Sequence, residues 1–161
     1  MIFQPIKNFN LALSAHLAYD AFYVLKGKFM NKYEQQVKQF HKLMEMAIDA
    51  PYTPDLLELR QKLINEEVSE LNVEIDSLIK ELKQTGTVRK ETKLKMFKEL
   101  ADLQYVLSGM VVALGIPMEE VFARVQKSNL SKLVNGKPLK REDGKVLKGP
   151  NYQKPDLSDL A

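Results

Sequence analysis

The chain has 161 residues, of which 45% are hydrophobic, so it can bury one substantial core and its length favours a single domain. It contains no cysteine, which excludes disulfide bonds and thiolate metal sites and agrees with a reducing cytoplasm. Its formal net charge of +3 is weak beside the strongly basic footprint of nucleic-acid-binding proteins, so a nucleic-acid partner is not favoured.

The first predicted helix spans residues 8–26, and Gly27 ends it. Apolar residues lie on two of its sides, as expected for a helix packed between others or at a contact between subunits, and core packing is the favoured alternative. His16 is interpreted as a core or interface histidine. No apolar run approaches the ~20 residues that cross a membrane, and the N-terminus lacks a signal-peptide pattern. We therefore expect no membrane span and a cytoplasmic location.

The second predicted helix begins after Asn31, a possible N-cap, and runs to Asp49, with Pro51 beyond its end. Gln36 and Phe40 share one face, which would allow an amide hydrogen bond to a nucleobase and stacking on it. Core packing is the favoured alternative for Phe40. The side expected to face the core comprises Tyr33, Val37, Phe40, Met44 and Ala47.

The third predicted helix is long, beginning at a cap formed by Thr53 or Asp55 and ending at a turn around Gly86. One apolar seam is expected to be buried, and it comprises Ile64, Val68, Leu71, Ile75, Leu78 and Leu82. The second seam places carboxylates at packing positions, and it comprises Leu59, Leu63, Glu66, Glu70 and Val73.

The fourth predicted helix ends at Leu114 and repeats this design. Its apolar seam comprises Met96, Leu100, Leu103, Leu107, Met110 and Leu114, and its mixed seam comprises Glu99, Asp102, Val106, Gly109 and Ala113. In an antiparallel hairpin with its turn beside Gly86, Glu67 lies level with Asp102, and Glu70 lies level with Glu99. The two helices are therefore predicted to direct their carboxylates toward each other.

Carboxylates gathered in this way repel one another by roughly 4 kcal/mol per pair at about 4 Å and an effective dielectric constant of about 20. They therefore need protons or cations, and oxygen ligands without Cys or His favour Mg²⁺ or Mn²⁺. A ferritin-like di-iron site is less favoured, because it needs a Glu-x-x-His motif and neither histidine lies three residues after a Glu. Solvated acidic faces are the common alternative for each single residue.

The fifth predicted helix spans residues 117–126, and Glu119 and Glu120 complement the helix dipole in its first turn. Glycine and proline then interrupt the chain, so residues 130–161 are predicted to form an irregular arm. Residues 134–147 contain turn signals that would also suit a short hairpin. This arm holds seven Lys/Arg and four Asp/Glu.

The pattern Glu66-Glu67-x-x-Glu70 followed by Glu99-x-x-Asp102 resembles the metal motif of the all-α nucleoside triphosphate pyrophosphohydrolases. That group includes MazG-like proteins, dimeric dUTPases and phosphoribosyl-ATP pyrophosphohydrolases. Residues 127–132 and 143–152 resemble the C-terminal arm of its members, so the resemblance covers roughly residues 31–157. We therefore expect one MazG-like all-α domain over residues 1–161, with residues 130–161 as its C-terminal arm. Residues 1–30 are expected to be an extra N-terminal helix, about which the resemblance says nothing.

The resemblance implies hydrolysis of a (deoxy)nucleoside triphosphate between its α and β phosphorus atoms, with Mg²⁺ or possibly Mn²⁺, as in the cleansing of nucleotide pools. Glu67, Glu70, Glu99 and Asp102 would hold the metal, while Glu66 would act with Glu67 in catalysis, as base or as a further ligand. The residues implied to close over the substrate are Asn129, Lys132, Lys145, Lys148 and Tyr152. For each lysine, a solvated surface role is an equal alternative.

We expect an all-α fold, an antiparallel bundle of about five helices with an irregular C-terminal arm. Two helices with two seams each present more packing surface than one small bundle covers, so a homodimer or homotetramer is expected. Two other classes remain, a non-catalytic helical module that binds partners and a nucleic-acid-binding protein. Release of pyrophosphate in the presence of Mg²⁺ would separate the enzyme from both.

Overall fold

The computed structural model describes residues 30–160, which contain four α-helices and no strand. The predicted helix over residues 8–26 and the interpretation of His16 lie outside the described residues. The all-α prediction is confirmed for the part of the chain that is described. The helices are α2 (Lys32–Leu43), α3 (Pro54–Thr85), α4 (Lys90–Leu114) and α5 (Met118–Leu130).

Helix α2 begins where the sequence predicts, but it ends earlier. The side chain of Asn31 accepts a hydrogen bond from the backbone N–H of Glu34 at 3.0 Å, and the carboxylate of Glu34 accepts one from the backbone N–H of Asn31 at 3.2 Å. The predicted continuation to Asp49 is wrong. After α2 the chain turns, and Asp49 and Ala50 donate backbone hydrogen bonds to the last carbonyl groups of α4, at 3.0 and 2.8 Å. These carbonyls have no partner within α4, which explains why the connector leaves the helical conformation.

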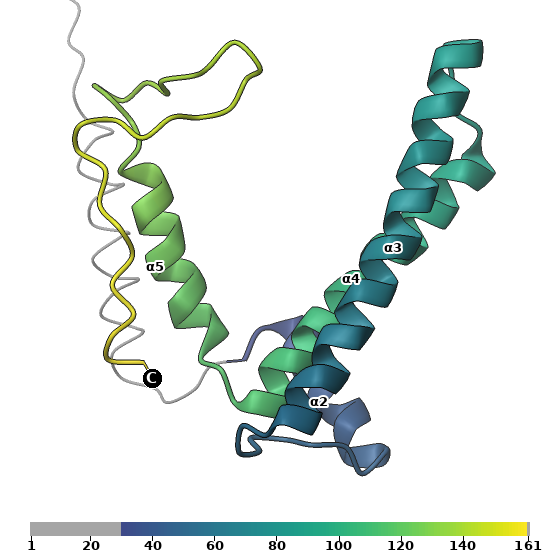
Figure 1. The fold of residues 1–161 in the computed structure, drawn as a ribbon, viewed down its shortest axis with the longest axis vertical. Coiled ribbons are helices and arrows are strands. Elements are labelled where there is room, and N and C mark those ends of the chain that lie inside the picture. Colours follow the sequence, from purple (N-terminus) through teal and green to yellow (C-terminus); the bar gives the residue numbers. More distant parts are fainter. Residues whose placement is uncertain (1–29, 161) are drawn as a thin grey trace, which may run out of the picture.

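Helices α3 and α4 lie side by side along most of their length, and α2 packs against α4 (Figure 1). Thr53 caps α3 by accepting a hydrogen bond from Leu56 N–H at 3.3 Å. Gly86 ends α3 in the left-handed conformation, with φ of 71°, and a turn leads into α4. The sequence therefore located both ends of α3 and the connection between the two helices.

The apolar core lies where α2 crosses the C-terminal half of α4. Val37, Val112 and Ala113 have at most 1% of their surface exposed. On α2 the buried side consists of Glu34, Val37 and His41. The predicted core side was therefore only partly right, because Tyr33 and Met44 are 59% and 57% exposed.

The apolar seam of α3 is only partly buried, since Ile64, Leu71 and Leu78 are half-buried and the other three members are exposed. Val68, Ile75 and Leu82 are 39%, 37% and 49% exposed, and Leu59 and Val73 of the other seam are also exposed. The half-buried side of α3 combines Ile64, Leu71 and Leu78 of this seam with Glu67. On α4, Leu100 and Leu107 are exposed as well. A helix with one close neighbour covers one side only, so these seams stay open in the single chain.

Helix α5 leaves the other helices at residues 115–117, where Gly115 has φ of 64° and the axes of α4 and α5 are bent by 116°. Figure 1 shows the result, a V with α2, α3 and α4 in one limb and α5 with the C-terminal residues in the other. Helix α5 extends to Leu130, beyond the predicted residue 126. Among the described residues no single helix is long and apolar enough to cross a membrane, although the bent pair of α4 and α5 is by length and composition.

After α5 the chain forms the irregular arm that the sequence predicts. Isolated β-bridges join Val134 to Lys137 and Lys140 to Val146. Gly136 and Gly144 have φ of 74° and 85°, so both glycine turn signals form turns. We call residues 32–114 the hairpin limb and residues 118–160 the arm limb.

Candidate metal centre

Three carboxylates converge between α3 and α4. Glu67 and Glu70 come from α3, Glu99 comes from α4, and one oxygen of each lies within 4.8 Å of the others. A spacing of three residues puts Glu67 and Glu70 on the same side of α3, one turn apart. The structure therefore brings together three of the four residues that the sequence predicts as metal ligands. We call Glu67, Glu70, Glu99 and Asp102 the acidic cluster.

Asp102, the fourth predicted ligand, lies beside this group, one turn after Glu99 on α4. The ammonium group of Lys98 links the two, because its Nζ atom lies 3.0 Å from an oxygen of Glu99 and 2.8 Å from an oxygen of Asp102. The charge of Asp102 also acts on Glu67 across the two helices. All four carboxylates thus share one electrostatic environment.

The electrostatics of the acidic cluster are unfavourable for Glu67. Partial burial raises the pKa of Glu67, and the negative charges of Glu70, Asp102 and Glu99 raise this pKa further. Lys98 opposes these effects, and hydrogen bonds with Asp102 and Glu99 in turn raise the pKa of Lys98. The cluster therefore holds more negative charge than its one close cation balances.

The donor set fits a hard divalent cation. Every converging group is a carboxylate, and ligand oxygens on opposite sides of a Mg²⁺ ion lie about 4 Å apart. The oxygens of Glu67, Glu70 and Glu99 are separated by distances of that order. Lys98 is already a cation among these carboxylates, so the position attracts positive charge. These residues could therefore hold a metal ion.

Lys98 was not singled out by the sequence analysis. The sequence nevertheless indicated this ion pair, because Lys98 and Asp102 are four residues apart on a helix, the spacing at which opposite charges pair. Glu66, predicted to take part in catalysis, is exposed. Its side chain lies about 100° around the helix from that of Glu67, so it borders the three converging carboxylates.

The predicted base-recognition residues lie elsewhere. Gln36 lines a groove of about 560 Å³ between α2 and α4, together with Phe97 and Gln104. Phe40 makes an edge-to-face contact with Tyr105, with ring centroids 5.7 Å apart. Positions two apart on a helix differ by about 200°, so the side of α4 that carries Phe97 is opposite the side that carries Glu99. The groove and the acidic cluster of the same chain therefore lie apart.

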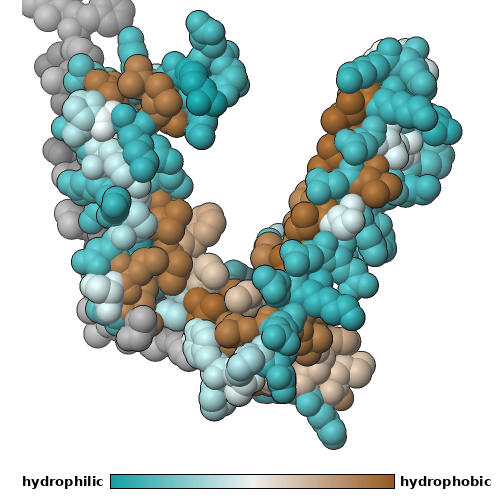
Figure 2. Space-filling model, viewed as in Figure 1, coloured by the Kyte–Doolittle hydropathy of each residue, from teal (hydrophilic) through white to brown (hydrophobic). Residues whose placement is uncertain are grey.

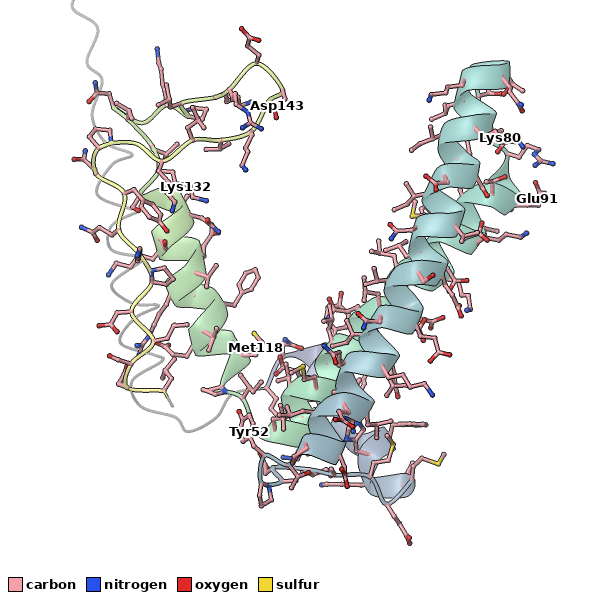
Figure 3. The ribbon with its side chains drawn as sticks, viewed as in Figure 1. Tyr52, Lys80, Glu91, Met118, Lys132 and Asp143 are labelled. Atoms are coloured by element: carbon pink, nitrogen blue, oxygen red, sulfur yellow. The ribbon has the colours of Figure 1, made fainter. Side chains whose placement is uncertain are left out.

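The predicted phosphate-binding residues lie on the arm limb. The Nζ atom of Lys132 donates to Asn129 Oδ1 at 2.6 Å, and the Nζ atom of Lys148 lies 4.5 Å from the centre of the Tyr152 ring. The backbone N–H of Lys145 donates to Asp143 Oδ1 at 3.1 Å. Figure 3 shows Lys132 and Asp143 on the limb opposite to the one that carries Lys80 and Glu91. These residues form two local pairs but do not meet the acidic cluster of their own chain.

Comparison with known protein families gives one result that bears on this site. Residues 37–129, more than half of the chain, match the family model described as phosphoribosyl-ATP pyrophosphohydrolase. The match contains all four residues of the acidic cluster, most of the residues that line the groove between α2 and α4, and most of α5, whereas Gln36 lies just before it. No curated protein sequence matches the chain.

Proposed function

Because the chain belongs to the phosphoribosyl-ATP pyrophosphohydrolase family, we propose that it hydrolyses a nucleoside triphosphate to the monophosphate and pyrophosphate with Mg²⁺. The observation that carries this proposal is the convergence of Glu67, Glu70 and Glu99 within 4.8 Å between two helices. Helix packing alone would not gather like charges at such a distance, because each pair costs free energy unless a cation is bound.

The carboxylates have separate tasks in this proposal. Glu67, Glu70, Glu99 and Asp102 would hold the cation between α3 and α4. When bound, Mg²⁺ supplies positive charge to phosphate oxygens and makes a nearby water more acidic. The water oxygen attacks the α phosphorus, the bond from that phosphorus to the bridging oxygen breaks, and pyrophosphate leaves.

Glu66 is the proposed base. It is exposed at the border of the acidic cluster, so its carboxylate can accept the proton of the attacking water without being enclosed by the other acids. Glu66→Gln should then lose turnover while the protein still binds most of its Mg²⁺. If Glu66 is a ligand instead, the same substitution weakens Mg²⁺ binding, which calorimetric titration measures directly.

Phosphoribosyl-ATP is a second candidate substrate, because the matching family model carries its name. It contains the same triphosphate chain as ATP, so the same acidic cluster would serve both reactions. The recognition of the base and of any substituent on it would differ. Gln36 and Phe40 are proposed for that role, together with Asn129, Lys132, Lys145, Lys148 and Tyr152 of the arm limb.

A substrate panel tests the proposed function. The purified protein is incubated with the canonical and modified nucleoside triphosphates and with phosphoribosyl-ATP, and pyrophosphate and monophosphate are measured with Mg²⁺, with Mn²⁺ and with a chelator. We expect stoichiometric release of both products that stops when the chelator is added. Orthophosphate in place of pyrophosphate would assign cleavage to a different bond. No metal-dependent product from any member of the panel would favour a non-catalytic partner-binding module.

We also propose that the protein forms a homodimer or a dimer of dimers. The support is the open apolar seam of α3 and α4, where Val68, Ile75, Leu82, Leu100 and Leu107 are all exposed in the single chain. Soluble monomers rarely expose large apolar patches, so the number of exposed apolar residues on these two helices favours a partner. Light scattering at micromolar concentration measures the mass, and a monomer would contradict the proposal.

A further inference from the structure

Lys98 makes contacts with the carboxylates that a nearby lysine on the same helix does not make. Its Nζ atom lies 3.2 and 3.0 Å from the two oxygens of Glu99 and 2.8 Å from an oxygen of Asp102. Lys95 lies one turn before Glu99, which is also a spacing at which opposite charges pair. In the described part of the chain, however, Lys95 forms no ion pair with a carboxylate. The contact with three carboxylate oxygens therefore distinguishes Lys98 from an ordinary surface lysine.

The acidic cluster contains two places that suit a cation, and Glu99 borders both. One lies between Glu67, Glu70 and Glu99, where an oxygen of each is within 4.8 Å of the others. The second lies between Glu99 and Asp102, and the ammonium group of Lys98 fills it. A carboxylate has two oxygens and can serve one cation with each. Sites with two divalent ions place these about 3.5–4 Å apart. The cluster therefore has the layout of a two-cation site in which one cation is a side chain.

The charges of the acidic cluster and Lys98 together favour a single divalent ion. The cluster has four carboxylates, and Lys98 neutralises the charge of one of them. Binding of one divalent ion then leaves one formal negative charge, whereas two ions would make the group positive. Cations held close together repel one another just as the carboxylates do. A second ion is therefore favourable only after the ammonium group has left.

The place that Lys98 fills is open to water. The side chains of Lys98 and Asp102 are 62% and 40% exposed, and Figure 2 shows hydrophilic residues over much of the hairpin limb. A free ion can reach Asp102, so lack of access does not keep a second ion away. The ammonium group competes with that ion instead. Because Lys98 is attached to the same helix one turn from Asp102, its ammonium group competes at a high effective concentration.

We propose that Lys98 takes the place of a second metal ion, so that each chain binds one divalent cation when no substrate is present. This inference rests on the proposed function, since it treats the acidic cluster as the metal site. Lys98 holds Glu99 and Asp102 together and neutralises part of their charge. An ammonium group cannot bind a water molecule as a ligand and make it more acidic, as a metal ion does. Lys98 is therefore a positioning residue for these two carboxylates.

Counting bound Mn²⁺ tests this inference without any turnover. Mn²⁺ prefers the same oxygen ligands as Mg²⁺, and electron paramagnetic resonance measures the ion that stays free in solution. The full chain is titrated without substrate, and the double variant Glu67→Gln with Glu99→Gln gives the background. We expect one Mn²⁺ per chain in the wild type and two in Lys98→Gln. Lys98→Met repeats the experiment with a side chain that cannot bind the ion through an oxygen, and it should also bind two.

Two further variants separate this role from a general effect of charge. Lys95→Gln is the matched control, because it removes the same charge from α4 without touching an ion pair of the cluster, and it should still bind one Mn²⁺. Lys98→Arg keeps a positive charge beside Glu99 and Asp102, so it should also bind one. Thermal melts give a second measurement. Mg²⁺ should raise the melting temperature more in Lys98→Gln than in the wild type, because two ions then stabilise the folded state.

The possible outcomes distinguish this inference from the proposed function. Two bound ions in the wild type, or one in both Lys98→Gln and Lys98→Met, would overturn the role of Lys98 and leave the proposed function standing. No ion above background in the wild type would remove the metal site on which both depend. One ion in the wild type and two in the Lys98 variants, without product from any member of the substrate panel, would support the role of Lys98 while the proposed function fails.

Discussion

Charged side chains lie on the side of α3 that faces α4 at two places, and the two places behave differently. Arg60 is 3% exposed, and its Nε atom has no hydrogen-bond partner among the described residues. Glu67 follows seven residues later on nearly the same side of the helix, and it lies among other carboxylates at the border of the solvent. Arg60 is a single cation buried in the core, whereas Glu67 belongs to a cluster of several negative charges.

The surroundings of Arg60 explain its role. A Cβ atom at Gly109 would lie 3.3 Å from Arg60 Nη1 and 3.5 Å from His41 Nε2, so the missing side chain makes room for both groups. His41 donates from Nδ1 to the carbonyl oxygen of Ala47 at 2.7 Å, and burial lowers the pKa of His41. Burial also lowers the pKa of Arg60. We call His41, Arg60 and Gly109 the buried junction. It fills space where three helices meet, and no ligand is needed to explain it.

The comparison shows that an inward-facing charge is not by itself a sign of a functional site. What distinguishes the acidic cluster is like charge at short range with access to solvent, because only that arrangement creates a demand for a cation. Substitutions in the acidic cluster should therefore change turnover and metal binding, whereas substitutions around Arg60 should change stability.

The largest expected difference is in turnover. Glu70→Gln should lower the turnover rate by at least about 10-fold to 100-fold, because loss of a metal ligand should cost no less than loss of an outer-shell partner. It should also remove the rise in melting temperature caused by Mg²⁺. Without metal, the variant should be as stable as the wild type or more so, since one repulsive charge is gone. Steady-state kinetics and thermal melts with and without Mg²⁺ measure these effects.

Arg60→Met is the matched control, because it removes a charge from the same side of α3. Replacing a buried ion by an apolar side chain of similar length is expected to be neutral or stabilising by up to about 2 kcal/mol. Turnover and the Mg²⁺ response should stay close to wild type. Full activity in Glu70→Gln, or a lost metal response in Arg60→Met, would reverse the roles of the two regions.

The next largest effect concerns Gly109. Gly109→Val should lower the free energy of unfolding by about 1–3 kcal/mol, because the side chain would press on Arg60 and His41. Gly109→Ala should lose less, since alanine is favoured over glycine in a helix by about 1 kcal/mol and this offsets part of the contact cost. Urea denaturation measures both. If the valine variant is as stable as the wild type, the junction is not closely packed.

The contributions of His41 and Glu67 to the free energy of unfolding should change in opposite directions as the pH falls. The folded-state pKa of His41 lies below 6.5, so its contribution to stability is present above that pH and is lost as the pH falls. The folded-state pKa of Glu67 lies above 4.5, so its contribution is present below that pH and is lost as the pH rises through the folded-state pKa.

Urea midpoints measured without metal across acidic and neutral pH give a direct test. His41→Asn should remove the loss of stability on the acid side of pH 6.5. Glu67→Gln should remove the loss of stability as the pH rises. Parallel pH profiles for the two variants would mean that other groups control the titration of the folded state.

The smallest expected effect is at Lys98. Lys98→Gln removes the cation beside Glu99 and Asp102, so Mg²⁺ should bind more tightly. The lysine side chain is 62% exposed, and solvent screens its interactions. The gain should therefore be small, roughly five-fold at most in the dissociation constant. Calorimetric titration of Mg²⁺ measures it, and weaker binding in the variant would show that Lys98 supports the site.

The sequence by itself determined that the described residues form helices in four places, the turn at Gly86 and the approach of Glu67 and Glu70 to Glu99. These features depend on local rules, namely caps, glycine conformations and the helical repeat, and two helices joined by a short turn have few ways to pack. The same rules correctly assigned the arm to turns and irregular chain, because glycine and proline act within a few residues.

The tertiary structure alone decided which sides of the helices are covered. The periodicity of α3 shows that two seams exist, but it does not show that Ile64, Leu71 and Leu78 are half-buried while Val68, Ile75 and Leu82 stay exposed. The end of α2 likewise depends on Asp49 and Ala50, whose backbone groups bond to α4, and their partners are distant in sequence. Nor could spacing reveal that the arm limb points away from the acidic cluster, because that depends on the bend at Gly115 and on the hydrogen bonds around it. Patterns along one helix report where apolar and charged groups lie, and packing against the rest of the molecule decides which of them meet.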